Sequence, residues 1–157
     1  MTEFAPGTPA PDFTGITTDG DEVSLADFSG RKLILYFYPK DDTPGCTRQA
    51  CSLRDLNEEI REKGAAILGV STQDKASHQR FSEKYRLNFP LLADTDKEVA
   101  RAYGALGSGG LLSRAVNALG FATRITYIID EQGRIEHVIE DPDCGNHGEE
   151  VLKLLAS

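Results

Sequence analysis

The sequence has no long hydrophobic run and no excess of basic residues, and it has only three cysteines, an odd number. Its longest unbroken apolar run, Leu33 to Tyr38, is far shorter than the roughly 20 residues that a membrane span needs. The first residues, Met1 to Phe4, lack the basic and apolar stretches of a secretory signal. We therefore expect a cytoplasmic protein that does not span a membrane.

Acidic residues outnumber basic ones, with 25 Asp and Glu against 17 Lys and Arg and a net charge of −8. This balance argues against nucleic acids and anionic membranes as partners, because both are bound by basic surfaces. It also opposes the formation of another anion, so a reactive thiolate in this chain needs a positive charge nearby. With 157 residues, of which 39% are apolar, the chain is expected to form a single domain over 1–157 with its own core.

Apolar patterning predicts buried strands that alternate with helices. Strands are expected at 32–38, 65–71 and 89–93, and helices at 44–63, 75–86, 96–103 and 149–155. Two hairpins are expected, one pairing 13–16 with 22–25 and one pairing 124–130 with 134–140. This order predicts an α/β sandwich with a central mixed sheet flanked by helices and an N-terminal hairpin extension, and it is compatible with a thioredoxin-like fold.

The segment from Pro39 to Cys46 leaves a buried strand and enters a helix. Thr43 suits the N-cap and Pro44 suits the first helical position, where its missing N–H has no cost. Cys46 then falls at the third helical position. Unpaired backbone N–H groups and the positive end of the helix dipole favour a thiolate there.

Cys46 also lies on the apolar stripe of this helix, at the end nearest the loop. The stripe continues through Ala50, Leu53, Leu56 and Ile60. Burial opposes a charged sulfur, and the neighbouring carboxylates of Asp41 and Asp42 would oppose it further. The helix terminus therefore needs help from a cation, for which Lys40 is one local candidate.

Cys51 follows Cys46 by five residues, a spacing that differs from the Cys-x-x-Cys of disulfide oxidoreductases. In an ideal helix it separates the two Cα atoms by about 8.7 Å and about 140° around the axis. A disulfide needs Cα atoms roughly 4.4 to 6.8 Å apart. If these two cysteines pair, the first turns of the helix must unwind.

Several motifs in this chain carry a family resemblance. Pro39-x-x-x-Thr43-x-x-Cys46 is similar to the active-site signature of the peroxiredoxins. The wider pattern resembles the PrxQ branch, also called bacterioferritin comigratory proteins; it comprises 43–55, 89–94, 102–104 and 124–130. The resemblance covers nearly the whole chain, from Pro11 to the last helix.

This resemblance implies a peroxidase that reduces hydrogen peroxide and organic hydroperoxides without a metal, flavin or other cofactor. It makes Cys46 the attacking thiolate, which becomes a sulfenic acid, and Cys51 the thiol that resolves it into an intramolecular disulfide. Thr43 would offer its hydroxyl to the thiolate and the peroxide, Arg124 would supply the missing cation, and Pro39 would shield the sulfur from water. Thioredoxin or a similar dithiol would then reduce the disulfide, and a monomer is expected.

Plainer interpretations of these residues stay open at this point. Cys46 could be a structural core cysteine and Cys51 a passive small residue. Arg124 could form an ordinary surface ion pair, and Thr43 could do no more than cap the helix.

Other residues fall outside the resemblance. Cys144 is most simply an idle loop cysteine, and the alternatives are a second resolving thiol or a metal ligand together with His147. His78 and His137 show no evident partner in the sequence and are expected at the surface. The segment 104–122 combines a glycine-rich stretch with apolar residues at helical spacing, which indicates a core-covering helix or an apolar lid near the active site.

Two other functions would also use these cysteines. A protein-disulfide oxidoreductase on the same fold is disfavoured by the Cys-x4-Cys spacing. A metal-binding or holdase protein would use the three cysteines with His147. The absence of a paired Cys-x-x-Cys disfavours a zinc site of that kind.

Overall fold

The computed structural model describes residues 5–106 and 121–156. Its centre is a mixed seven-stranded sheet in the order β2-β1-β5-β4-β3-β6-β7. The strands are β1 Thr14–Thr17, β2 Glu22–Ser24, β3 Lys32–Phe37, β4 Ala65–Ser71, β5 Leu91–Ala93, β6 Ile125–Ile129 and β7 Ile135–Ile139. β3, β4 and β5 run parallel, and the strands outside them pair antiparallel. The predicted mixed sheet is confirmed.

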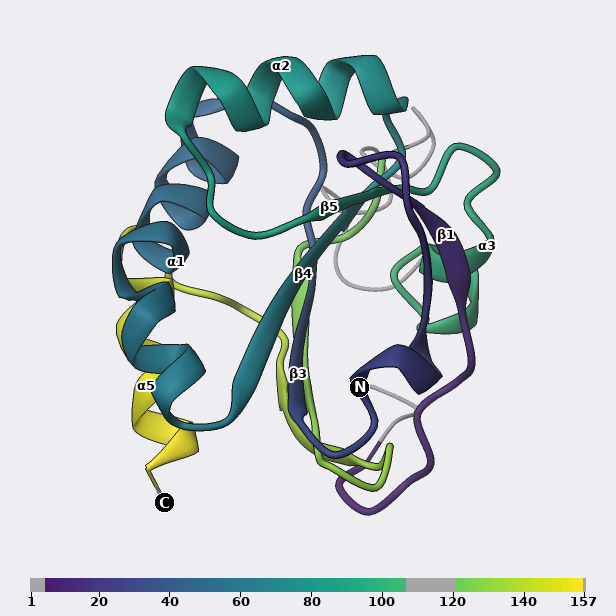
Figure 1. The fold of residues 1–157 in the computed structure, drawn as a ribbon, viewed down its shortest axis with the longest axis vertical. Helices are drawn as coiled ribbons and strands as arrows, with labels where there is room; N and C mark the ends of the chain where they lie inside the picture. The colour runs from purple at the N-terminus through teal and green to yellow at the C-terminus, as the bar shows by residue number, and fades with distance from the viewer. Residues whose placement is uncertain (1–4, 107–120, 157) are drawn as a thin grey trace.

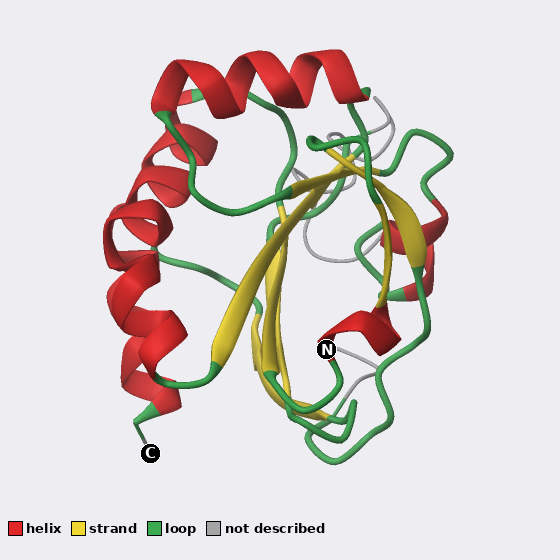
Figure 2. Ribbon diagram, viewed as in Figure 1, coloured by secondary structure: helices red, strands yellow, loops and turns green. Residues whose placement is uncertain are grey.

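Helices lie on both sides of this sheet (Figures 1 and 2). They are η1 Leu25–Phe28, α1 Pro44–Glu62, α2 Lys75–Tyr85, α3 Glu98–Ala102, η2 Cys144–Asn146 and α5 His147–Leu155. α1 and α5 pack side by side on one side of the sheet, and α3 lies on the other side. No helix within the described ranges is long and apolar enough to cross a membrane.

Most predicted elements are found within one or two residues of their expected bounds, and the largest differences have local causes. α3 begins only at Glu98, because Lys97 before it adopts a left-handed backbone with φ of 63°. The Asp94 carboxylate, four residues before the helix, accepts hydrogen bonds from the backbone N–H groups of Val99 and Ala100. It therefore satisfies the donors at the N-terminus of α3. α5 begins at His147, two residues earlier than expected.

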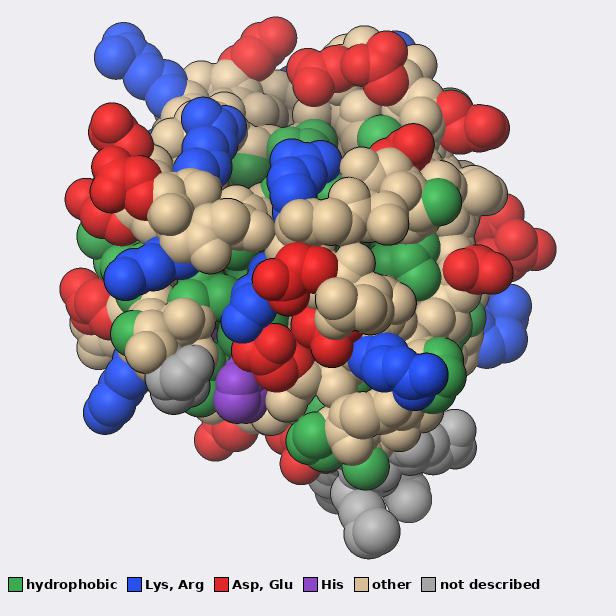
Figure 3. All heavy atoms as spheres, turned by 60° about the horizontal axis from the view of Figure 1, so that its bottom comes forward, with side chains coloured by type: hydrophobic (Ala, Val, Ile, Leu, Met, Phe, Trp, Pro, Cys, Tyr) green, Lys and Arg blue, Asp and Glu red, His purple; other side chains and the backbone are tan. Residues whose placement is uncertain are grey.

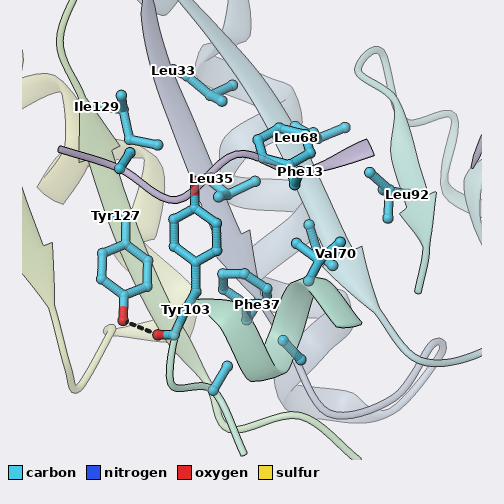
Figure 4. Close-up of a cluster of buried hydrophobic side chains, with 14 of the residues drawn as sticks. Phe13, Leu33, Leu35, Phe37, Leu68, Val70, Leu92, Tyr103, Tyr127 and Ile129 are labelled. Carbon is cyan, nitrogen blue, oxygen red and sulfur yellow. Dashed lines mark hydrogen bonds between the residues drawn. The ribbon is translucent and has the colours of Figure 1, made fainter. Parts of the chain in front are cut away.

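The core has two parts because β3 is buried on both faces. Leu33, Leu35 and Phe37 point into one cluster of buried side chains, and the alternate residues of β3 point into the other. The first cluster lies under α3 and is drawn in Figure 4, where Tyr103 and Tyr127 pack beside these side chains. The second cluster lies under α1, α2 and α5, and it includes Cys46.

Charged side chains are mixed at the surface. On the face drawn in Figure 3, acidic and basic side chains lie side by side, and Lys and Arg do not gather into one patch. This face therefore has none of the basic stripe by which nucleic-acid-binding surfaces are known.

Close backbone packing holds α5 against α1. The Gly148 N–H donates to Ser52 Oγ at 2.9 Å, and a Cβ built on Gly148 would lie 2.5 Å from the Ser52 carbonyl oxygen. Real Cβ atoms do not approach backbone this closely, so only glycine allows the two helices to lie at this distance.

Replacing Gly148 by alanine is expected to push α5 away from α1 and to destabilise the protein by about 1–3 kcal/mol. Gly145 is the matched control, because a Cβ there meets nothing within 4 Å. Gly145→Ala should change the free energy of unfolding by less than about 0.5 kcal/mol. Urea unfolding of both variants measures the difference, and equal stabilities would contradict this account of the α1–α5 contact.

Candidate active site

Cys46 occupies the place predicted for it. Thr43 is the N-cap of α1 with extended backbone, Pro44 is the first helical residue, and Cys46 is the third. The Cys46 side chain is only 1% exposed, and it lies on the core side of the helix with Ala50 and Leu53. Its sulfur is therefore buried at the positive end of a 19-residue helix.

A guanidinium group meets the Cys46 sulfur directly. Arg124, just before β6, donates from Nη2 to Cys46 Sγ at 3.3 Å and from Nη1 to Gln49 Oε1 at 2.7 Å. Cys46 and Gln49 are three residues apart, so they lie on the same face of α1. The cation is thus fixed across the first turn of the helix. Lys40, the local candidate, instead lies over the Phe121 ring at 5.6 Å.

Gly45 makes room for this cation. A Cβ built on Gly45 would lie 3.1 Å from Arg124 Nη2, which is tighter than most real contacts. The missing side chain at position 45 therefore lets the guanidinium approach the helix terminus closely.

The carboxylate of Asp41 is turned toward α2. It is buried and accepts hydrogen bonds from the Tyr38 hydroxyl at 2.6 Å and from Ser77 Oγ at 2.8 Å. His78 Nδ1 lies 2.6 Å from Asp41 Oδ2, the oxygen that also accepts from Ser77. His78 Nε2 donates to the Leu92 carbonyl at 3.1 Å, because a carbonyl only accepts. Both ring nitrogens of His78 therefore have partners inside the protein.

The expectation that His78 lies at the surface is wrong. Its side chain is completely buried, and it joins the loop before Cys46 to α2. The polar residues around it in α2 suggest a solvent-facing helix. Phe81, three residues later on the same face and also buried, is the signal that could have placed His78 inside. His137 is half-buried rather than exposed, with Nε2 3.6 Å from Glu136 Oε1.

Asp42 also turns away from Cys46. Its carboxylate accepts from Lys84 Nζ at 2.7 Å and from the Tyr85 hydroxyl at 2.6 Å. These two hydrogen bonds, that from Lys84 first, lower the pKa of Asp42 from its ordinary value. The two carboxylates that could have opposed a thiolate are thus bound to α2, and they fasten the loop to that helix.

Thr43 and Pro39 lie in the same loop with defined contacts. Thr43 Oγ1 donates to the Lys40 carbonyl at 3.0 Å, so its proton points neither to the helix backbone nor to the sulfur. The Pro39 carbonyl accepts from Ser71 Oγ at 3.2 Å and from Gln73 Nε2 at 3.1 Å, which ties the end of β3 to β4.

Cys51 lies one turn further along the same helix and is half-buried. Both Cys46 and Cys51 are free thiols, and α1 is continuous from Pro44 to Glu62. The two residues are therefore separated by the geometry of a regular helix, and their sulfurs can meet only if its first turns open.

Tyr36 lies in the second core cluster, which also contains Cys46. The side chain is 1% exposed, and within the described part of the chain the hydroxyl oxygen has no hydrogen-bond partner. Burial, and then the negative charge that Cys46 would carry, raise the pKa of Tyr36 well above its ordinary value. The hydroxyl is therefore a neutral donor close to the thiols.

Residues 6–138 match the model of the AhpC/TSA family. The chain belongs to this family. Peroxiredoxin Bcp of Escherichia coli K12 is 41% identical to it over 155 residues, which cover 99% of this chain and 97% of that protein. The expectation of a peroxiredoxin, a thiol-dependent peroxidase that uses a peroxide and a thiol reductant, is therefore confirmed.

Solved structures of peroxiredoxins share the fold. PrxQ of Xylella fastidiosa superposes with a TM-score of 0.88 at 25% identity, covering 99% of this chain and 98% of that one. The bacterioferritin comigratory protein of Xanthomonas campestris, studied for its alkyl peroxide reduction activity, gives 0.83 at 27% identity, with coverage of 99% and 98%. The thioredoxin-like fold and the resemblance to this branch are thus confirmed.

The third cysteine of this peroxiredoxin lies close to the same site. Cys144 begins η2, which packs on α1, and its Sγ is 3.7 Å from the point where a Gly45 Cβ would stand. No local pattern in the sequence could indicate this contact, because the two residues are nearly a hundred positions apart.

His147 of this peroxiredoxin is buried and has both ring nitrogens in hydrogen-bond contacts. Nε2 lies 2.9 Å from Thr126 Oγ1, and Nδ1 lies 2.9 Å from Glu150 Oε1. Neither nitrogen is available for a metal shared with Cys144. Among the described residues no group of His, Cys, Asp and Glu is arranged to hold a metal ion.

The expected helix or lid at 104–122 lies mostly outside the described residues. At its edges Ala105 and Ala122 are fully buried, and Leu106 packs against the first core cluster.

The buried His147 gives this peroxiredoxin a pH-dependent stability. Burial lowers its pKa from the ordinary value, and the Glu150 hydrogen bond offsets this only in part. As the pH falls, His147 of the unfolded chain takes up a proton at about pH 6.5, whereas His147 of the folded protein does so only at a lower pH. The contribution of His147 to stability is thus present above that pH and is lost as the pH falls through the folded pKa.

We expect the free energy of unfolding to fall between pH 7.5 and pH 5.5, and to fall less in a His147→Gln variant, which has no titrating group at this position. Denaturant unfolding of both proteins at the two pH values measures this. Equal pH dependence in the two proteins would show that His147 titrates alike in the folded and unfolded states.

Proposed function

We propose that this peroxiredoxin reduces hydrogen peroxide and organic hydroperoxides with Cys46 as its attacking thiolate. The observation that carries this assignment is the 3.3 Å contact between Arg124 Nη2 and Cys46 Sγ at the N-terminus of α1. A sulfur acceptor facing a guanidinium and a helix terminus is stabilised as an anion, and the thiolate is the nucleophilic form of cysteine.

In the first step the Cys46 thiolate attacks one oxygen of the peroxide, the O–O bond breaks, and Cys46 becomes a sulfenic acid. The leaving oxygen gains negative charge and takes up a proton to become water or an alcohol. Arg124 and the backbone N–H groups of the first helical turn would stabilise this charge, because fixed donors at a developing charge lower the energy of the transition state. Thr43 adds its hydroxyl when it turns from the Lys40 carbonyl to the peroxide, and Pro39 keeps water from the sulfur.

In the second step Cys51 attacks the sulfenic sulfur, water leaves, and an intramolecular disulfide forms. The first turns of α1 must open for this. The loop before the helix stays fastened through Asp41 and Asp42 to α2, so the opening is confined to the start of α1. Opening also moves Cys46 out of its buried position. An external thiol can then reach the disulfide.

The reductant in this scheme is thioredoxin or a similar dithiol, which supplies the two electrons that close the cycle. The redox chemistry resides in sulfur alone, and the scheme uses no cofactor. We further propose a monomer in the cytoplasm.

The assignment is tested by mapping the cysteines after one equivalent of hydrogen peroxide, in a Cys144→Ser background that leaves one pair available. Trypsin cleaves after Lys40, Arg48 and Arg54, so Cys46 and Cys51 fall in the separate peptides 41–48 and 49–54. We expect these two peptides to be joined by a disulfide, and peroxide to be consumed stoichiometrically.

Cys46→Ser in the same background should consume no peroxide and give no linked peptides. Continued turnover by that variant would reject Cys46 as the nucleophile. Consumption of peroxide without linked peptides, when Cys46 is intact, would leave the peroxidase in place but reject Cys51 as its resolving partner.

A further inference from the structure

Cys144 lies at Gly45, the residue before Cys46. The point where a Gly45 Cβ would stand is 3.7 Å from Cys144 Sγ and 3.1 Å from Arg124 Nη2, and Arg124 Nη2 is 3.3 Å from Cys46 Sγ. Both thiols are therefore found around the first turn of α1. The missing side chain at Gly45 leaves the space between them open to movement of either sulfur.

Packing of the following helix sets this position. α5 is held on α1 by the close contact of Gly148 with Ser52, and by the contact of His147 with Thr126 in β6. Cys144 precedes His147 by three residues, so these two buried contacts keep its turn close to the first turn of α1.

The turn that carries Cys144 can move without loss of the core. η2 spans three residues and has no side-chain cap, and a Cβ on Gly145 would meet nothing within 4 Å. Its ties are exposed hydrogen bonds, such as that from Asp143 N–H to Glu150 Oε1 at 2.9 Å. Cys144 itself is half-buried, a free thiol beside a buried one.

The two possible partners of Cys46 therefore differ in what they require. Cys51 is on the same helix, so its approach breaks the backbone hydrogen bonds of α1. Cys144 comes from a different element, and its approach needs rearrangement of one short turn. The second motion disturbs fewer backbone hydrogen bonds than the first.

We propose that Cys144 is a second resolving thiol for Cys46, which acts while the first turns of α1 are still closed. The proposal rests on the assignment of Cys46 as the peroxide-reducing residue. In the step, Cys144 Sγ attacks the sulfur of the Cys46 sulfenic acid. The S–O bond breaks, the oxygen leaves as water with the Cys144 proton, and a Cys46–Cys144 disulfide forms. A dithiol reductant then returns both thiols.

Such a second route shortens the lifetime of the sulfenic acid. A sulfenic acid that waits for a helix to open can meet another peroxide and be oxidised irreversibly to sulfinic acid. A thiol that reaches it from the closed state protects the enzyme during that interval.

The test uses a Cys51→Ser variant, with the Cys51→Ser/Cys144→Ser double variant as its matched control. Each receives one equivalent of hydrogen peroxide in the presence of dimedone, which traps sulfenic acid. Trypsin places Cys144 alone in the peptide 135–153, so a link to 41–48 identifies the proposed pair. We expect Cys51→Ser to give this linked peptide within monomeric protein and to lose most of its dimedone adduct. The double variant should give the Cys46 adduct alone.

Equal dimedone adduct in the two variants, with no linked peptide, would overturn the proposal and leave the peroxidase assignment intact. A link found only between two chains would overturn it as well, because the geometry described is that of one chain. If neither variant consumes peroxide, the assignment of Cys46 itself fails, and the proposal fails with it.

Discussion

In the proposed mechanism, the chemistry of this protein depends on the contact between Arg124 and Cys46. This contact joins two segments 78 residues apart and brings a cation to a buried sulfur, where burial opposes the charged form. The sheet makes this possible, because β6, which follows Arg124, pairs directly with β3, which leads into the Cys46 loop. Gln49 fixes the other arm of the guanidinium, and Gly45 removes the side chain that would keep it away.

The chain is acidic, but the two carboxylates nearest to Cys46 in sequence are turned away from this contact. Asp41 and Asp42 are close to Cys46 in sequence, yet their carboxylates bind to His78 and Lys84 of α2. The same contacts fasten the loop before Cys46 to this helix. One set of residues thus turns the carboxylates toward α2 and anchors the loop.

Local pattern was enough to predict most of the fold. The strand at 65–71 has the predicted bounds and the helix begins at Pro44 as predicted, because buried strands and capped helices carry their signals within a few residues. Contacts between distant segments carry no such signal. Only the family resemblance indicates that Arg124 meets Cys46, local pattern wrongly puts His78 at the surface, and the approach of Cys144 to Gly45 depends on the packing of α5 against α1.

The central claim is that the Arg124 guanidinium stabilises the charge that develops when Cys46 attacks a peroxide. The direct measurement is the rate constant for the reaction of Cys46 with hydrogen peroxide, in a Cys51→Ser/Cys144→Ser protein with and without Arg124→Ala. Removal of Arg124 should lower this rate constant by a factor on the order of 100. Equal rate constants in the two proteins would contradict the account.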